Sequence, residues 1–133
     1  MKEELMLNVA TIGTNFIVDW FLKSVQDNQG IRCCAMYTRK KEHAEKLAEK
    51  YHIEMIYTDL DEMLSNPEID IIYIASPNSL HYTYAEKALT AGKHVFCEKP
   101  LVSDNEQCAK LYELAEKKQR FLFEAIVTLH APN

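Results

Sequence analysis

The sequence predicts an α/β fold: a doubly wound parallel sheet of about six strands, the Rossmann arrangement, with helices on both faces. Short apolar runs rich in β-branched residues alternate with segments in which apolar residues recur at helical spacing. The clearest unit is residues 70–101, where an apolar run at 71–75 and another at 94–97 flank a helical pattern. Because helical crossovers link parallel strands, this unit is a βαβ motif.

The rest of the chain follows the same alternation. Further strands are expected at residues 5–12, 31–37, 53–57 and 121–125. Helical patterns are expected at 17–25, 44–51, 59–65, 80–91 and 103–115.

Residues at several helix ends support these boundaries. Thr58 and Ser103 each stand three residues before an acid, as in a capping box. Asn78 or Ser79 is expected to cap the helix of the βαβ unit, and Gly92 stands where a helix ends in a left-handed residue.

Composition narrows the class of protein. The chain has 133 residues, of which 47% are hydrophobic and 26% charged, as expected of one soluble globular domain. A net charge of -5 argues against a nucleic-acid partner, and no apolar run approaches a membrane span or a secretion signal. The four cysteines lack C-x-x-C spacing, which favours buried reduced thiols over a metal site or disulfides. We therefore expect a cytoplasmic protein with no metal and no membrane or nucleic-acid partner.

Polar residues follow both strands of the βαβ unit. Ser-Pro-Asn at 76–78 follows the first strand, and Glu-Lys-Pro at 98–100 follows the second. Since both follow the carboxyl ends of parallel strands, they should lie side by side at the edge where open α/β sheets bind ligands.

The turn after the first strand carries part of a dinucleotide fingerprint. From Gly13 it reads G-T-N-F-I-V, so it keeps only the first glycine of G-x-G-x-x-G. Asn15 tolerates a positive φ better than other non-glycine residues and could hold the turn. Val18 takes the third glycine position, where it would push the helix off the sheet or be absorbed by small neighbours. On this turn alone, a plain strand-to-helix turn without a ligand is an equally good interpretation.

The end of the second strand bears cations where NAD-binding domains usually have an acid. The residues are Tyr-Thr-Arg-Lys-Lys at 37–41. Arginine binds a phosphate through its planar fork, so our hypothesis is that Thr38 and Arg39 favour NADP over NAD. The alternative is a solvated basic first turn, although cations at that position oppose the helix dipole.

With these features in place, the sequence resembles the N-terminal domain of the Gfo/Idh/MocA family of NAD(P)-dependent oxidoreductases. The similar segments are V-A-T-I-G-T-N-F-I, Y-I-A-S-P-N-S-L-H, A-G-K-H-V-F-C-E-K-P-L and the F-E-A of residues 123–125. They cover nearly the whole chain in order, and E-K-P preceded by A-G-K-H-V is the most specific of them. The resemblance implies an oxidoreductase that transfers hydride between a nicotinamide cofactor and a sugar, polyol or diol-type substrate.

The resemblance also implies roles for individual residues. Those expected to bind the cofactor are Gly13, Thr14, Asn15, Phe16 and Ile17 at the pyrophosphate, Thr38 and Arg39 at the adenosine ribose, Ser76, Pro77, Asn78 and His81 beside the phosphates and nicotinamide ribose, and Glu98 and Lys99 at the nicotinamide. Lys99 is the candidate catalytic residue, because an ammonium there could polarise a carbonyl or hold an alkoxide. The alternatives are a solvated Lys99 paired with Glu98 and a purely structural His81.

The expected domain organisation follows from the same resemblance. Residues 1–125 would form the NAD(P)-binding domain, and 126–133 would begin the connection to a missing C-terminal domain that holds the small-molecule substrate. The chain alone would bind NADP, or alternatively NAD, without turnover, and the parent enzyme would be a homo-oligomer. Exposed apolar surface near 121–132 would favour self-association of the fragment. A non-catalytic NADP(H)-sensing or interaction module, and a domain that has lost its cofactor, are the competing interpretations.

Overall fold

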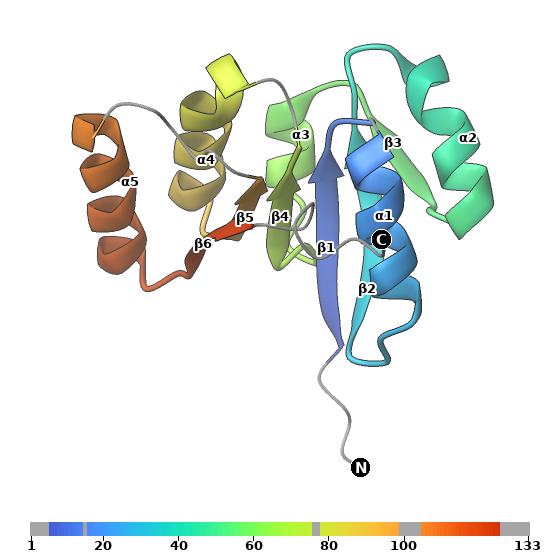
Figure 1. The fold of residues 1–133 in the computed structure, drawn as a ribbon, viewed down its shortest axis with the longest axis horizontal. Helices are drawn as coiled ribbons and strands as arrows, with labels where there is room; N and C mark the ends of the chain where they lie inside the picture. The colour runs from blue at the N-terminus through green and yellow to red at the C-terminus, as the bar shows by residue number, and fades with distance from the viewer. Residues whose placement is uncertain (1–5, 15, 76–77, 99–104, 126–133) are drawn as a thin grey trace, which may run out of the picture.

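The computed structural model describes residues 6–14, 16–75, 78–98 and 105–125, and it confirms the expected fold class (Figure 1). One six-stranded sheet has the order β3-β2-β1-β4-β5-β6, and every neighbouring pair of strands is parallel. The strands are β1 (Leu7–Ile12), β2 (Ile31–Tyr37), β3 (Met55–Tyr57), β4 (Ile71–Ile74), β5 (His94–Glu98) and β6 (Leu122–Ala125). The helices are α1 (Phe16–Gln26), α2 (Lys41–Tyr51), α3 (Leu60–Leu64), α4 (His81–Thr90) and α5 (Asn105–Lys118), with a 3-10 turn η1 (Asn78–Leu80) before α4.

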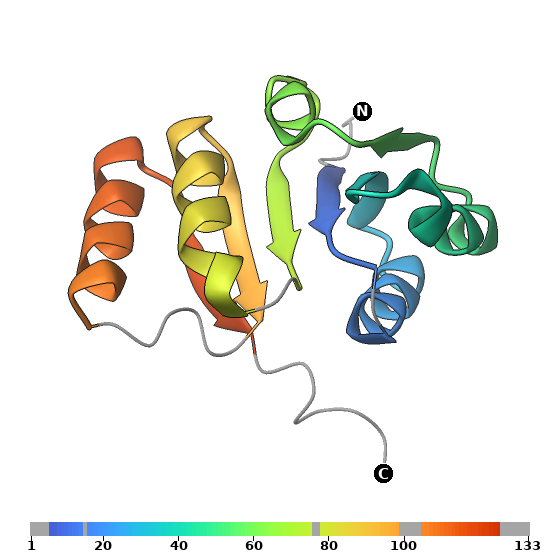
Figure 2. The ribbon, with the colours of Figure 1, turned by 90° about the horizontal axis from the view of Figure 1, so that it is seen from above.

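The sheet separates two hydrophobic cores. Helices α1 and α2 cover one face, and α3, α4 and α5 cover the other (Figure 2). Side chains alternate along each central strand, so Val9 packs on the α1 side whereas Ala10 and Ile12 pack on the α4 side. Burial on both faces explains why the central strands are continuous apolar runs and not alternating ones.

The strand order reverses between β1 and β4. From β1 the chain builds outward to β2 and β3, and it then returns to the other side of β1 to form β4, β5 and β6. Ile12 and Ile74 are paired at the carboxyl ends of the two central strands, and the Ala75 amide donates to the Ile12 carbonyl at 2.9 Å. The crevice where the order reverses is the place at which open α/β sheets bind their ligands.

Two of the expected helix caps differ from the prediction. At α3 the capping residue is Asp59 and not Thr58, because the Asp59 carboxylate accepts from the Glu62 amide at 3.3 Å. The N-cap position of α4 is Leu80, and not Asn78 or Ser79 as expected. The chain enters that helix through η1, and Leu80 at the N-cap makes no side-chain hydrogen bond. Such 3-10 turns are frequent at the ends of α-helices.

The exit from α4 is as predicted. Gly92 has a φ of 86°, and its amide donates to the Leu89 carbonyl at 2.9 Å, while the Lys93 amide donates to Ala88 at 3.0 Å. These bonds satisfy carbonyls of the last helical turn and direct the chain into β5. The other expected capping box begins at Ser103, which lies outside the described residues.

The start of β6 is held by an imidazole. Nδ1 of His94 accepts from the Phe121 amide at 2.9 Å, and the two rings stack with centroids 5.2 Å apart. This nitrogen accepts only while the imidazole is neutral. Burial, followed by the charge of Arg120, lowers the pKa of His94.

Acid should therefore destabilise this end of the sheet. In the unfolded chain the His94 imidazole is protonated below a pH of about 6.5. In the folded chain it is protonated only at a lower pH. Stability contributed by the neutral imidazole is thus present above about pH 6.5 and is lost as the pH falls toward the lowered pKa. In urea unfolding at pH 7 and pH 5, the wild-type chain should lose more stability than His94→Phe. His43→Phe, which replaces an exposed histidine, is the control. An equal loss of stability in the wild-type chain and in His94→Phe would contradict this prediction.

Candidate functional site

The turn after β1 places a glycine at the crevice. Gly13 has a φ of 112°, a conformation that side-chain-bearing residues rarely adopt, and its amide donates to the Tyr37 carbonyl at 3.3 Å. Thr14 and Ile17 are half-buried and Phe16 is exposed, whereas Asn15 lies outside the described residues. The structure therefore brings most of the expected pyrophosphate residues to the mouth of the crevice.

Val18 is fully buried between α1 and the sheet. Its side chain belongs to the same core as Val9. The valine at the third glycine position is thus part of the core between α1 and the sheet.

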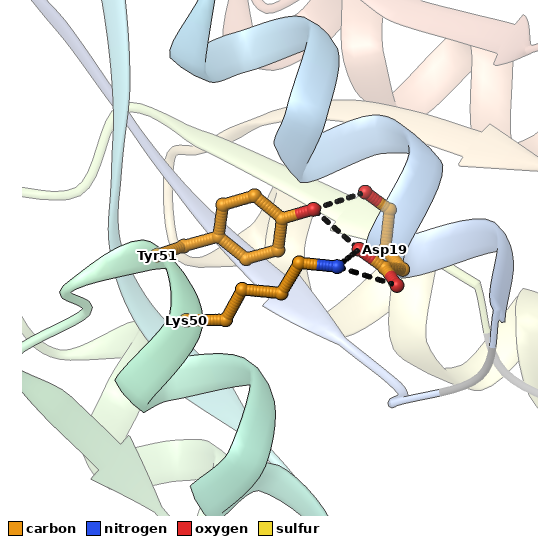
Figure 3. Close-up of polar contacts among 3 residues, drawn as sticks. All are labelled: Asp19, Lys50 and Tyr51. Carbon is orange, nitrogen blue, oxygen red and sulfur yellow. Dashed lines mark hydrogen bonds and ion pairs between the residues drawn. The ribbon is translucent and has the colours of Figure 1, made fainter.

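A three-residue contact fixes α1 against α2 (Figure 3). The Lys50 ammonium donates to the two Asp19 carboxylate oxygens at 3.2 and 3.3 Å. The Tyr51 phenol donates to the Asp19 carbonyl oxygen at 3.1 Å and to its carboxylate. The hydrogen bond from Tyr51, more than the charge of Lys50, lowers the pKa of Asp19. The pair is exposed, so we expect it to orient the helix more than to stabilise the fold.

The turn and helix fit the pyrophosphate of a dinucleotide. The positive end of the α1 dipole lies after Gly13, where it favours an anion, and the glycine lets backbone approach closely. Asp19 is the acid in the first turn of α1. Its carboxylate points toward α2, where Lys50 compensates its charge, so it does not oppose an anion at the crevice.

The corner after β2 presents the exposed basic residues Arg39, Lys40 and Lys41 beside a closed turn. The Thr38 hydroxyl accepts from the Lys40 amide at 3.3 Å and donates to the Lys40 carbonyl at 3.1 Å, and Thr38 is buried. Arg39 is exposed. Thr38 shapes the turn and Arg39 faces solvent, and their expected contact with the adenosine ribose stays a prediction.

The corners after β4 and β5 lie at the same edge of the sheet. Ala75 is buried at the end of β4, and the residues expected next to the cofactor, Ser76 and Pro77, lie outside the described residues. Asn78 opens η1. His81, at the start of α4, is 1% exposed, which fits the structural alternative better than a surface contact. Its contact with the cofactor stays a prediction.

Glu98 is turned into the protein. It ends β5 with 6% of its surface exposed, and Oε2 accepts from the Tyr73 phenol at 2.5 Å. Lys99 and Pro100, the other residues of this corner, lie outside the described residues. Sequence reasoning missed Tyr73. The available signal was a tyrosine inside the apolar run of β4, because a buried phenol needs a hydrogen-bond partner.

Other classes of site find no support in the described part of the chain. Its histidines, cysteines and acids form no group of three that could hold a metal, and its four cysteines are free thiols. Of these four cysteines, Cys97 is buried and the other three are partly exposed. Within the same residues, no helix is both long and apolar enough to cross a membrane.

The fold and the crevice define a Rossmann-type dinucleotide-binding domain. Residues 7–126 match the family described as the oxidoreductase family with an NAD-binding Rossmann fold, GFO_IDH_MocA. The chain belongs to this family.

Relatives of known name agree with this membership. The chain is 38% identical over 128 residues to the scyllo-inositol 2-dehydrogenase (NADP(+)) IolU of Bacillus subtilis, covering 96% of this chain and 39% of that protein. It is 36% identical to the uncharacterized oxidoreductase YgjR of Escherichia coli, with the same coverage of 96% and 39%. It is also 41% identical over 76 residues to the D-xylose 1-dehydrogenase (NADP(+)) of Hypocrea jecorina, covering 57% of this chain and 19% of that one. The chain thus spans 39% of the length of the first two relatives.

Solved structures share the fold. The 3-ketoreductase KijD10 of Actinomadura kijaniata, in complex with NADP and TDP-benzene, gives a TM-score of 0.87 at 28% identity, covering 96% of this chain and 39% of that chain. The biliverdin reductase of Synechocystis, in complex with biliverdin and NADP+, gives a TM-score of 0.85 at 27% identity, covering 93% of this chain and 39% of that chain.

Proposed function

We propose that this chain is the NADP(H)-binding domain of an oxidoreductase that transfers hydride between the nicotinamide and a sugar, polyol or diol-type substrate. The observation that carries the proposal is Gly13, whose positive φ lies at the carboxyl end of β1 beside the first turn of α1, where the strand order reverses. Two of the relatives are dehydrogenases of an inositol and of a sugar, which supports the substrate class.

The choice of NADP over NAD rests on the corner after β2. Arg39 is exposed at the carboxyl end of that strand, and neither Thr38 nor Arg39 is an acid that would bond a ribose 2′-hydroxyl. A guanidinium can bind a 2′-phosphate through two parallel hydrogen bonds. The names of IolU and the xylose dehydrogenase, both NADP-dependent, support this choice, and NAD is the alternative.

The catalytic assembly would need more than this domain. Residues 1–125 form the cofactor-binding part of the proposal and 126–133 the start of a connection to a substrate domain. The 39% share of the relatives' length supports this organisation. When bound, the nicotinamide supplies the hydride donor or acceptor. This chain's own residues bind and orient it, and Lys99 contributes an ammonium that polarises the substrate carbonyl. The isolated chain would bind cofactor without turning over a polyol.

Titration with each cofactor tests the proposal, with Trp20 on α1 as the fluorescent reporter. The wild-type chain should bind NADPH more tightly than NADH. Arg39→Ala should weaken NADPH binding by about tenfold or more, the value of a charge-assisted hydrogen bond, and leave NADH nearly unchanged.

Arg32→Ala is the matched control for this variant. Arg32 is exposed on the same strand, toward its amino end, where Nε donates to the Asn8 side chain at 2.8 Å. Its loss should not alter cofactor preference. An Arg39→Ala protein that still prefers NADPH would remove the specificity assignment, and a wild-type chain that binds neither cofactor would remove the proposed function.

A further inference from the structure

A buried carboxyl and a buried phenol meet between β4 and β5 on the α1 side of the sheet. Tyr73 is 0% exposed and Glu98 6% exposed, and the phenol donates to Oε2 at 2.5 Å. Burial, together with the neighbouring Glu98, raises the pKa of Tyr73. The phenol therefore keeps its proton and acts as the donor, and the carboxylate is the acceptor.

The phenol is held in place by aromatic rings. The Phe21 ring of α1 stacks on Tyr73 with centroids 3.8 Å apart and an interplanar angle of 4°, and Phe96 packs edge-on at 5.9 Å. Both contacts leave the hydroxyl directed at Glu98. The donor is therefore preorganised, and the position of the carboxylate is fixed with it.

Such a pair is a poor way to fasten two strands. A buried charge has a desolvation cost that a well-packed apolar pair avoids. Val95 and Cys97, on the opposite face of β5, are fully buried in an apolar core. The location of the carboxylate at the last position of the strand, at the ligand-binding edge, calls for a reason other than stability.

That edge faces the nicotinamide end of the cofactor if the proposed function holds, and the inference rests on it. The adenosine is assigned to the corner after β2 through Arg39, and the pyrophosphate to the turn after β1 through Gly13. The dinucleotide is linear and the strand order continues from β1 to β4 and β5. Its nicotinamide half therefore extends over the carboxyl ends of β4 and β5.

We propose that Glu98, held by Tyr73, is a fixed negative charge that makes the nicotinamide half of the site favour the oxidised cofactor over the reduced one. The oxidised ring carries a positive charge and the reduced ring does not, whereas the phosphates of the two forms are the same. A carboxylate in a water-poor site attracts the charged ring more strongly than it would in water. Glu98 acts on the cofactor's charge, and Tyr73 is a positioning residue.

The decisive measurement is the ratio of the dissociation constants for NADP+ and NADPH, by calorimetry or by Trp20 fluorescence. Glu98→Gln keeps the shape of the side chain and removes the charge. It should shift the ratio against NADP+ by about three- to tenfold, the effect of one charge at moderate distance and intermediate dielectric.

Two further variants separate charge from structure. Tyr73→Phe removes the donor that holds the carboxylate in position, so its ratio should shift against NADP+ in the same direction as in Glu98→Gln, but by less. Glu124→Gln removes a charge from the neighbouring strand β6, where Glu124 pairs with Cys97 and is exposed. The ratio of dissociation constants should stay unchanged in this control.

The outcomes distinguish this inference from the proposed function. If Glu98→Gln weakens both cofactors equally, or neither, the pair only fastens the strands and the inference is overturned. If Glu98→Gln does not fold, a Tyr73→Phe protein whose ratio stays at the wild-type value overturns it as well. If the wild-type chain binds neither form, the proposed function fails first.

Discussion

Replacing Gly13 by valine should abolish tight binding of NADP(H), lowering the affinity by about a hundredfold or more. Gly13 has a φ of 112°, a conformation that is an outlier for a β-branched residue and is strained by about 1–3 kcal/mol. The added side chain would also stand where the backbone must approach the pyrophosphate. Fluorescence or calorimetric titration with NADPH measures the loss.

Gly92→Val is the matched control for this variant. Gly92 also has a positive φ, 86°, and a Cβ there would have no heavy atom within 4 Å. It lies between α4 and the amino end of β5, far along the strand from the ligand-binding edge. Both variants should lose similar stability, but only Gly13→Val should lose cofactor affinity. If Gly13→Val binds NADPH as well as Gly92→Val does, the turn is a plain strand-to-helix connection.

The fold was predictable because parallel sheets buried on both faces leave an unmistakable pattern. Apolar runs such as Ile71–Ile74 are too short for helices. In the segments between these runs, apolar residues recur at helical spacing. The boundaries were less predictable where backbone bonds decide them. β3 begins at Met55 and not at Ile53, because the Ile53 amide donates to the Ala48 carbonyl at 2.9 Å and so closes α2.

The corners of the site were predictable, but the directions of their side chains were not. The sequence places Glu98 in a polar corner, which suggests exposure to solvent. The strand continues one residue beyond 94–97, and the alternation of β5 then turns Glu98 to the face of Phe96, under α1. Whether that last residue belongs to the strand depends on pairing with Ala125 of β6, a contact distant in sequence.

Lys93 belongs to a segment that resembles the family, and its side chain makes hydrogen bonds within the fold. It lies in A-G-K-H-V, the part of the chain that precedes the E-K-P corner, and its side chain is 6% exposed. Its ammonium donates to the Asn66 carbonyl at 2.8 Å and to the Ile69 carbonyl at 2.7 Å. Burial lowers the pKa of Lys93, so these two carbonyls, in the loop between α3 and β4, compensate for lost hydration.

Lys93→Ala should therefore lower the free energy of unfolding by about 3 kcal/mol, because hydrogen bonds to charged groups contribute about 1.5–3 kcal/mol each and two carbonyls lose their donor. Urea denaturation measures the change. Lys87→Ala is the control: its exposed ammonium pairs with Asp61 at 3.1 Å, and its loss should cost less than about 1 kcal/mol. Equal costs for the two variants would mean that water replaces the ammonium at both carbonyls. A large cost at Lys93 with unchanged NADPH affinity would assign this lysine to the folding of β4 and β5.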